Sequence, residues 1–247
     1  MLYALGEFIL IVVGILADMQ INNWNENRQV QNKVELQLMN LKTAIQLDIE
    51  TNERVLGMEG FRFHAIKYLL ELAGETVKLY DYNYEEFPNQ PRILWNKPIP
   101  ENFDRAYVEA CFSAIDIGTA SSIINDKAIV EFSNSGLFSE LYNPQLKWII
   151  NDYYRDTEMW FSGAYWDYNL ELTVQTQNLL QDQYQIDLRR MGNVKDPIGL
   201  IRENRPIIIQ LHTLLDRISW NCELLVNGRK RAEQVILAID QELGENG

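Results

Sequence analysis

Residues 206–243 read PIIIQLHTLLDRISWNCELLVNGRKRAEQVILAIDQEL, and this stretch decides the fold class. Its apolar residues recur every three or four positions, the spacing that places side chains on one face of an α-helix. At Arg229 the pattern is interrupted, so we expect there either an ion pair that fixes the helix register or a place where the packed face opens to water. The other ten positions of the face are apolar or cysteine: Ile208, Leu211, Leu215, Ile218, Cys222, Leu225, Ala232, Ile236, Ile239 and Leu243.

A second helical pattern precedes it, between Trp24 and Gly57. There the positions expected to face the core, nearly all apolar, repeat with an eleven-residue period. Such a period is typical of a nearly straight helix in a bundle. We expect Gly57 and Gly60 to end this helix and a second helix, over 61–78, to fold back against it. The residues that define the pattern are Val34, Leu38, Leu41, Ile45, Ile49, Asn52 and Leu56.

The remaining segments carry helix and loop signals but no strand-rich block. Residues 81–104 hold four of the seven prolines and predict an irregular excursion. Pro206 is expected to open the last helix, as a proline at the first helical position does. Further helices are expected over 105–115, 120–124, 127–134 (capped by Asp126) and from Asn143-Pro144 to Gln183, with a loop over 186–204.

The N-terminal run MLYALGEFILIVVGILADMQINNW, residues 1–24, predicts a transmembrane helix. Its apolar part, Leu2–Ile21, has about the 20 residues that a helix needs to cross a bilayer. Tyr3 and Trp24 bracket it where interfacial aromatics lie. A cleaved signal peptide is disfavoured because no basic segment precedes the run and no small-residue cleavage site follows it.

A small and polar stripe runs along this predicted membrane helix. Glu7 and Asp18 are eleven residues apart, or three turns, with Gly14 between them and Asn22 and Asn25 continuing the stripe. Each acid costs up to about 3 kcal/mol in a bilayer, so we expect the helix to associate with copies of itself through the stripe. The alternative is a homo-oligomeric channel or proton-conducting subunit in which Glu7 and Asp18 face a central pore.

The composition and motifs argue against several classes of function. The net charge is −13, so the chain repels nucleic acid phosphates and we expect no nucleic acid partner. No nucleotide, zinc or nucleophile motif occurs, and we expect no catalytic residue, no metal site and no cofactor. Cys111 and Cys222 are well separated, and the sequence leaves their pairing open.

Aromatic side chains are dense between residues 153 and 168. At helical spacing such residues usually fill the core of a bundle. The run covers more than one helix face, however, so a ligand- or glycan-binding module or a partner surface is a further alternative. The residues proposed for that surface are Trp160, Tyr165, Trp166 and Tyr168.

Three stretches of the sequence are similar to those of a known protein family. The first is LYALGEF near the N-terminus, followed by IVVGIL and QINNWNE; the others are residues 132–154 and IDQEL at 239–243. The chain resembles an uncharacterised family of single-pass bacterial envelope proteins, defined only as a domain of unknown function. The resemblance implies a membrane helix with a helical domain on the periplasmic side of the inner membrane, and it implies no activity. Two departures are that no basic segment precedes Leu2 and that Asp18 stands where an apolar residue is usual.

Together these observations predict an all-α protein with one N-terminal transmembrane helix, residues 1–24, that continues into a long antiparallel helical bundle. Residues 25–247 would form the helical soluble domain, with the Pro-rich excursion at 81–104. We expect an oligomeric, membrane-anchored envelope protein with an interaction or sensory domain and no catalytic activity. Its expected partners are further copies of itself and the lipid bilayer.

Overall fold

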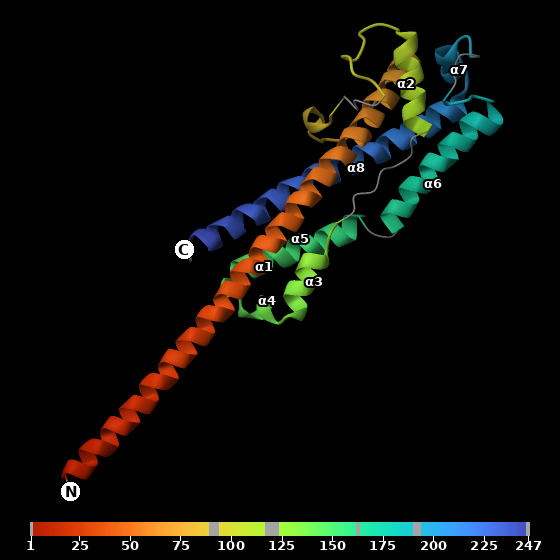
Figure 1. Cartoon of the computed structure of the whole chain (residues 1–247). Coiled ribbons are helices and arrows are strands. Elements are labelled where there is room, and N and C mark those ends of the chain that lie inside the picture. Colours follow the sequence, from red (N-terminus) through yellow and green to blue (C-terminus); the bar gives the residue numbers. More distant parts are fainter. Residues whose placement is uncertain (1, 89–93, 117–123, 162–163, 190–193, 246–247) are drawn as a thin grey trace. The chain divides into compact units, whose positions relative to one another are not determined.

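The computed structural model describes residues 2–88, 94–116, 124–161, 164–189 and 194–245, with side chains described from residue 10 onward except at 164–166 and 245 (Figure 1). All regular elements in these ranges are helices, which confirms the predicted all-α class. They are α1 (Leu2–Leu72), η1 (Tyr84–Glu86), α2 (Arg105–Asp116), α3 (Lys127–Asn134), α4 (Leu137–Glu140), α5 (Pro144–Phe161), α6 (Ala164–Asn178), the π-helical η2 (Leu179–Gln183), α7 (Pro197–Glu203) and α8 (Arg205–Glu245).

The chain divides into two compact units. The smaller unit comprises residues 1–45, 125–152 and 235–247, and the larger comprises residues 46–124 and 153–234. The long helices α1 and α8 contribute to both units.

In the smaller unit, one face of α1 is buried at the positions that the eleven-residue period predicts. Lys42 of α1 forms an ion pair with Asp240 of α8. Asn143 caps α5, because its side-chain oxygen accepts a hydrogen bond from the backbone N–H of Leu146 at 3.1 Å. The buried apolar residues of this unit are Val34, Leu38, Leu41, Ala44, Ile45, Phe132, Leu141, Leu146, Ile150, Val235 and Ile239.

In the larger unit, the second half of α1 packs antiparallel against α8, as predicted for the bundle (Figure 1). Glu75 lies 3.6 Å from Arg205 at the start of α8, whereas Asn52 faces Gly228 much later in α8. Helices α2, α6 and α7 complete a continuous apolar core. Eight of the eleven predicted face positions of α8 are buried in the two units, and Arg229, Ile236 and Leu243 are half-buried.

The predicted break at Gly57 and Gly60 is wrong, because α1 runs without interruption to Leu72. A glycine inside a helix costs only about 1 kcal/mol, which core packing offsets. The predicted separate helix over 61–78 is therefore the end of α1. The helix ends at Leu72, and Gly74 follows in the turn, where its φ of +89° allows the backbone N–H of Glu75 to bond to the carbonyl of Leu70 at 3.0 Å.

Other predicted boundaries also need correction. The predicted loop over 186–204 contains α7, which Asp196 caps by accepting a hydrogen bond from the Gly199 backbone N–H at 2.8 Å. Asp126 stands at the N-terminus of α3 but makes no capping hydrogen bond with its side chain. The long helix expected after Asn143 is described as α5, α6 and η2, which ends at Gln183 as predicted. Of the helix predicted over 120–124, only residue 124 is described, and it is not helical.

No helix in the described part of the chain is both long and apolar enough to cross a membrane. The structure thus gives no support to the transmembrane helix predicted for residues 1–24. The side chains of residues 2–9, which belong to that prediction, lie outside those described.

Candidate functional site

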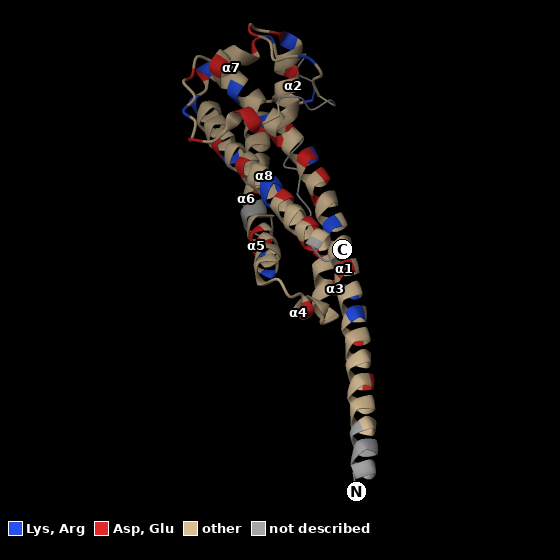
Figure 2. Cartoon of the chain, turned by 90° about the vertical axis from the view of Figure 1, so that its left-hand side faces the viewer, with Lys and Arg blue, Asp and Glu red and all other residues tan. Residues whose placement is uncertain are grey.

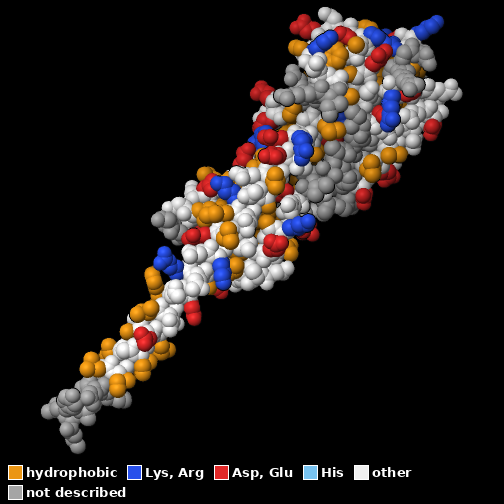
Figure 3. Space-filling view, in the orientation of Figure 1, with side chains coloured by type: hydrophobic (Ala, Val, Ile, Leu, Met, Phe, Trp, Pro, Cys, Tyr) orange, Lys and Arg blue, Asp and Glu red, His pale blue; other side chains and the backbone are white. Residues whose placement is uncertain are grey.

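The first feature that packing does not explain is the N-terminal part of α1, residues 10–24. Every residue of this segment is exposed, with Leu10 exposed at 73% and Trp24 at 63% (Figure 3). Asp18 is the one Asp, Glu, Lys or Arg residue between residues 10 and 24, and Figure 2 shows few charged residues along this end of α1. Since the exposed residues are consecutive, they surround the helix on all sides. The large apolar side chains among them are Leu10, Ile11, Val12, Val13, Ile15, Leu16, Met19, Ile21 and Trp24.

The predicted polar stripe lies on this exposed segment. Gly14, Asp18, Asn22 and Asn25 are all exposed, and a side chain added at Gly14 would meet nothing within 4 Å. The side chain of Glu7 lies outside the described residues. The structure therefore presents the described stripe residues to the outside of the chain and leaves their predicted role untested.

The second feature is a cavity of about 440 Å³ in the larger unit. It lies between the segment after α1, helix α6 and one face of α8. Four of its lining residues are aromatic, two carry opposite charges, and the others are a leucine and a threonine. They are Tyr80, Tyr82, Tyr168, Leu172, Thr213, Asp216, Arg217 and Trp220.

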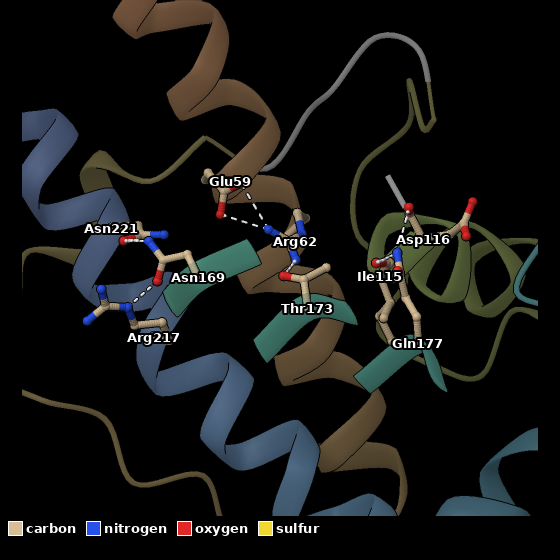
Figure 4. Close-up of polar contacts among 9 residues, drawn as sticks. All are labelled: Glu59, Arg62, Ile115, Asp116, Asn169, Thr173, Gln177, Arg217 and Asn221. Atoms are coloured by element: carbon tan, nitrogen blue, oxygen red, sulfur yellow. Dashed lines mark hydrogen bonds and ion pairs between the residues drawn. The ribbon is translucent and has the colours of Figure 1, made fainter. Parts of the chain in front are cut away.

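The guanidinium group of Arg217 is held in place within this cavity. It lies 4.2 Å from the ring centroid of Trp220 and 5.1 Å from that of Tyr168. Its Nε donates a hydrogen bond to Asn169, and the Asn169 amide donates to the Asn221 oxygen at 2.8 Å (Figure 4). Cation–π contacts and hydrogen bonds together fix the position of Arg217.

Asp216 differs from Arg217 in its surroundings. Burial raises the pKa of its carboxyl group, and nearby His212 partly opposes this effect. Within the described ranges, Asp216 makes neither a hydrogen bond nor an ion pair. A half-buried carboxylate without a donor is poorly solvated and can accept hydrogen bonds from a bound molecule.

A separate polar cluster lies deep in the larger unit. Arg62 Nη1 donates to both carboxylate oxygens of Glu59, at 3.0 and 3.1 Å, and Nη2 donates to Thr173 of α6 at 3.0 Å (Figure 4). Arg62 and Glu59 are only 1% exposed, and Arg62 Nε has no acceptor in the described part of the chain. Because solvent does not reach the cluster, we assign it a structural role that joins α1 to α6.

The predicted aromatic surface is only partly brought together. Tyr168 lines the cavity, whereas Trp160 is covered by the guanidinium group of Arg231, 4.9 Å from its ring centroid. The side chains of Tyr165 and Trp166 lie outside the described residues. Arg229 makes an ion pair, the first of the two predicted alternatives, with Glu86 of η1 at 3.4 Å.

Sequence reasoning did not identify most of the cavity. The signal on α8 was the series Thr213, Asp216, Arg217 and Trp220, whose spacing of three, four and seven residues places all four on one helix face. A charged pair next to a tryptophan on one face is a usable sign of a binding surface. Tyr80 and Tyr82 gave no comparable signal, because they come from a segment without a regular period.

No group of metal-binding side chains occurs among the described residues. Cys111 and Cys222 are both buried and free, and burial raises the pKa of each thiol. Neither thiol is therefore activated as a nucleophile. No protein-family model, curated protein or solved structure matches the chain.

Proposed function

We propose that the chain is a membrane-anchored, oligomeric protein whose helical domain serves as an interaction or sensory module without catalytic activity. The observation that carries the proposal is the exposure of apolar side chains on all sides of α1 over residues 10–24. Full burial of each large apolar side chain contributes about 1.5–3 kcal/mol. The segment therefore strongly favours an apolar environment.

A bilayer suits this segment better than a groove on a protein. A groove covers one face of a helix, whereas lipid can cover apolar side chains that point in several directions, as those of residues 10–24 do. In the sequence the apolar run continues back to Leu2, which brings it to about the 20 residues of a membrane crossing. The resemblance to envelope proteins supports placement in a bacterial inner membrane with the domain in the periplasm.

Self-association follows from the polar stripe on the same helix. Glu7 and Asp18 disfavour insertion by up to about 3 kcal/mol each, and less near the ends of the span. Contact between copies through Gly14 allows close approach of the helices and lets the polar side chains bond to each other. The proposed partners are therefore further copies of this chain and lipid.

Flotation with phosphatidylcholine vesicles tests the anchor. The full chain is expected to float with the vesicles and to resist extraction by alkaline carbonate. The double variant Val13→Arg/Leu16→Arg is expected to lose both properties, because each arginine at the centre of a membrane helix costs about 3 kcal/mol.

The matched control is Leu36→Arg/Met39→Arg, which makes the same change at two exposed apolar positions of α1 outside the predicted span. This control is expected to float like the unmodified chain. Flotation of the Val13→Arg/Leu16→Arg protein, or failure of the unmodified chain to float, would contradict the proposal.

A further inference from the structure

The cavity of the larger unit has the size and the composition of a small-molecule site. Its volume of about 440 Å³ lies within the range of about 300–1,000 Å³ that ligand pockets occupy. It is lined by aromatic rings together with a few polar groups that converge from α8. These polar groups are Thr213, Asp216 and Arg217.

Hydrogen bonds hold part of the aromatic wall of the cavity in place. Tyr80 and Tyr168 line the cavity although their side chains remain 57% and 51% exposed. The backbone carbonyl of Tyr80 accepts hydrogen bonds from the Tyr82 backbone N–H at 3.0 Å and from the Tyr84 hydroxyl at 2.9 Å. These bonds fix the turn that carries Tyr80, and Arg217 contacts the ring of Tyr168, so both rings are held at the cavity and a ligand meets them at little entropic cost.

A cationic ligand does not suit this site. Two of the four aromatic rings that line the cavity, Tyr168 and Trp220, already contact the guanidinium group of Arg217, with 5.1 and 4.2 Å to the ring centroids. A second positive charge at the same rings would be repelled by the first.

An anionic ligand does not suit the site either. Asp216 lines the cavity and repels negative charge, and the Nε of Arg217 is already bonded to Asn169. The chain as a whole carries a net charge of −13. The opposite charges of Asp216 and Arg217 leave the cavity close to neutral.

The remaining polar groups fit a molecule rich in hydroxyl groups. Asp216 can accept two hydrogen bonds from adjacent hydroxyls, one at each carboxylate oxygen. The Thr213 hydroxyl donates to the Ile209 carbonyl at 2.9 Å, which leaves its oxygen available as an acceptor. The C–H face of a sugar ring carries slight positive charge and stacks on the negative face of an aromatic ring.

We propose that the cavity between Tyr80, Tyr168 and the Thr213–Trp220 face of α8 binds a neutral saccharide. The sugar ring stacks on the exposed tyrosines, and two of its hydroxyls donate to Asp216. The inference is independent of the membrane anchor, since all the residues named belong to the larger unit.

Saturation-transfer NMR with the full chain in detergent tests the proposal. The probes are neutral di- and trisaccharides of glucose, galactose, mannose and N-acetylglucosamine, each at up to about 10 mM. At least one probe is expected to bind. Tyr168→Ala, Tyr80→Ala and Asp216→Asn are each expected to raise its Kd about tenfold or more.

Two control variants make the same chemical changes outside the cavity, at exposed positions. Tyr142→Ala and Asp182→Asn are expected to leave the Kd within about twofold. Circular dichroism verifies that each variant is folded. Choline and sialyllactose serve as a cationic and an anionic comparison probe. Binding of no neutral probe by the unmodified chain, equal binding by folded cavity variants, or binding of only the two charged probes would overturn the proposal.

Discussion

In the ion pair of Glu59 and Arg62, each buried charge depends on its partner for compensation. Both side chains are 1% exposed, and Thr173 provides the other described hydrogen bond to the guanidinium group. Removing one charge leaves the other buried without compensation. The pair joins α1 to α6, so its loss affects the core of the larger unit.

We therefore predict that Arg62→Met lowers the free energy of unfolding by about 3–5 kcal/mol, because it leaves the Glu59 carboxylate unpaired. The double variant Glu59→Met/Arg62→Met is expected to be more stable than Arg62→Met alone. Urea denaturation followed by circular dichroism measures both. As a control, Lys67→Met removes the ion pair of half-buried Lys67 with exposed Glu71 and is expected to cost less than about 1 kcal/mol. Similar losses for Arg62→Met and Lys67→Met would refute the assignment.

Asp216 gives a pH-dependent prediction. Burial raises the pKa of its carboxyl group in the folded chain above the unfolded value, so folding favours the protonated form. Its favourable contribution to stability is complete below the unfolded pKa and is lost as the pH rises through the folded pKa. Asp216→Asn is therefore expected to be more stable than the unmodified chain at pH 7.

That difference in stability should disappear as the pH falls below about 4, where both side chains are uncharged. Urea denaturation at a series of pH values measures it, with Asp182→Asn as the same substitution at an exposed position. A gain in stability that is the same at pH 7 and below pH 4 would exclude ionisation of Asp216 as its cause. A residue that lowers stability in its unmodified form is typical of a binding site.

At the scale of elements, Gly57 and Gly60 show what sequence reasoning about α1 missed. The period of Val34, Leu38 and Leu41 correctly identified the buried face of the helix. The two glycines suggest a helix end, but the feature that requires a glycine at position 60 lies elsewhere in the chain. A side chain at Gly60 would collide with the backbone of Pro88, and such a long-range contact leaves no local signal.

The two glycines form a matched pair for a stability measurement. Gly60→Ala is expected to lower the free energy of unfolding by roughly 1–3 kcal/mol, because the backbone of Pro88 must move. Gly57→Ala, where nothing lies within 4 Å, is expected to raise it by up to about 1 kcal/mol through helix propensity. Urea denaturation of both variants checks the signs. Equal effects of the two substitutions would show that the contact with Pro88 does not constrain α1.

The parts of the candidate site that the sequence predicted are those that carry a local signal. Tyr168 belonged to a dense aromatic run and was identified, and Arg229 was identified because it interrupted an apolar face. Asp216 and Trp220 lie on a regular polar face of α8, where most such residues are only solvated. What distinguishes them is the position of Tyr80 opposite, which depends on how the segment after α1 folds.

At the scale of the whole molecule, the buried residues and the exposed apolar residues of α1 occupy different parts of the helix. Burial in the smaller unit begins at Val34, and residues 10–24 are exposed throughout. The segment thus contributes nothing to the described core. Its apolar side chains are available for lipid and for other copies of the chain.

Removal of residues 1–25 is therefore expected to lower the oligomeric state in detergent while leaving the domain folded. Light scattering after size-exclusion chromatography measures the mass, and urea denaturation is expected to give an unfolding free energy within about 0.5 kcal/mol of that of the full chain. The Gly14→Leu and Asp18→Leu variants refine the test, since both keep the segment apolar but change the stripe. If self-association uses the stripe, both variants lower the oligomeric state although they make the segment more hydrophobic. An unchanged oligomeric mass after removal of residues 1–25 would instead place the self-association in the helical domain.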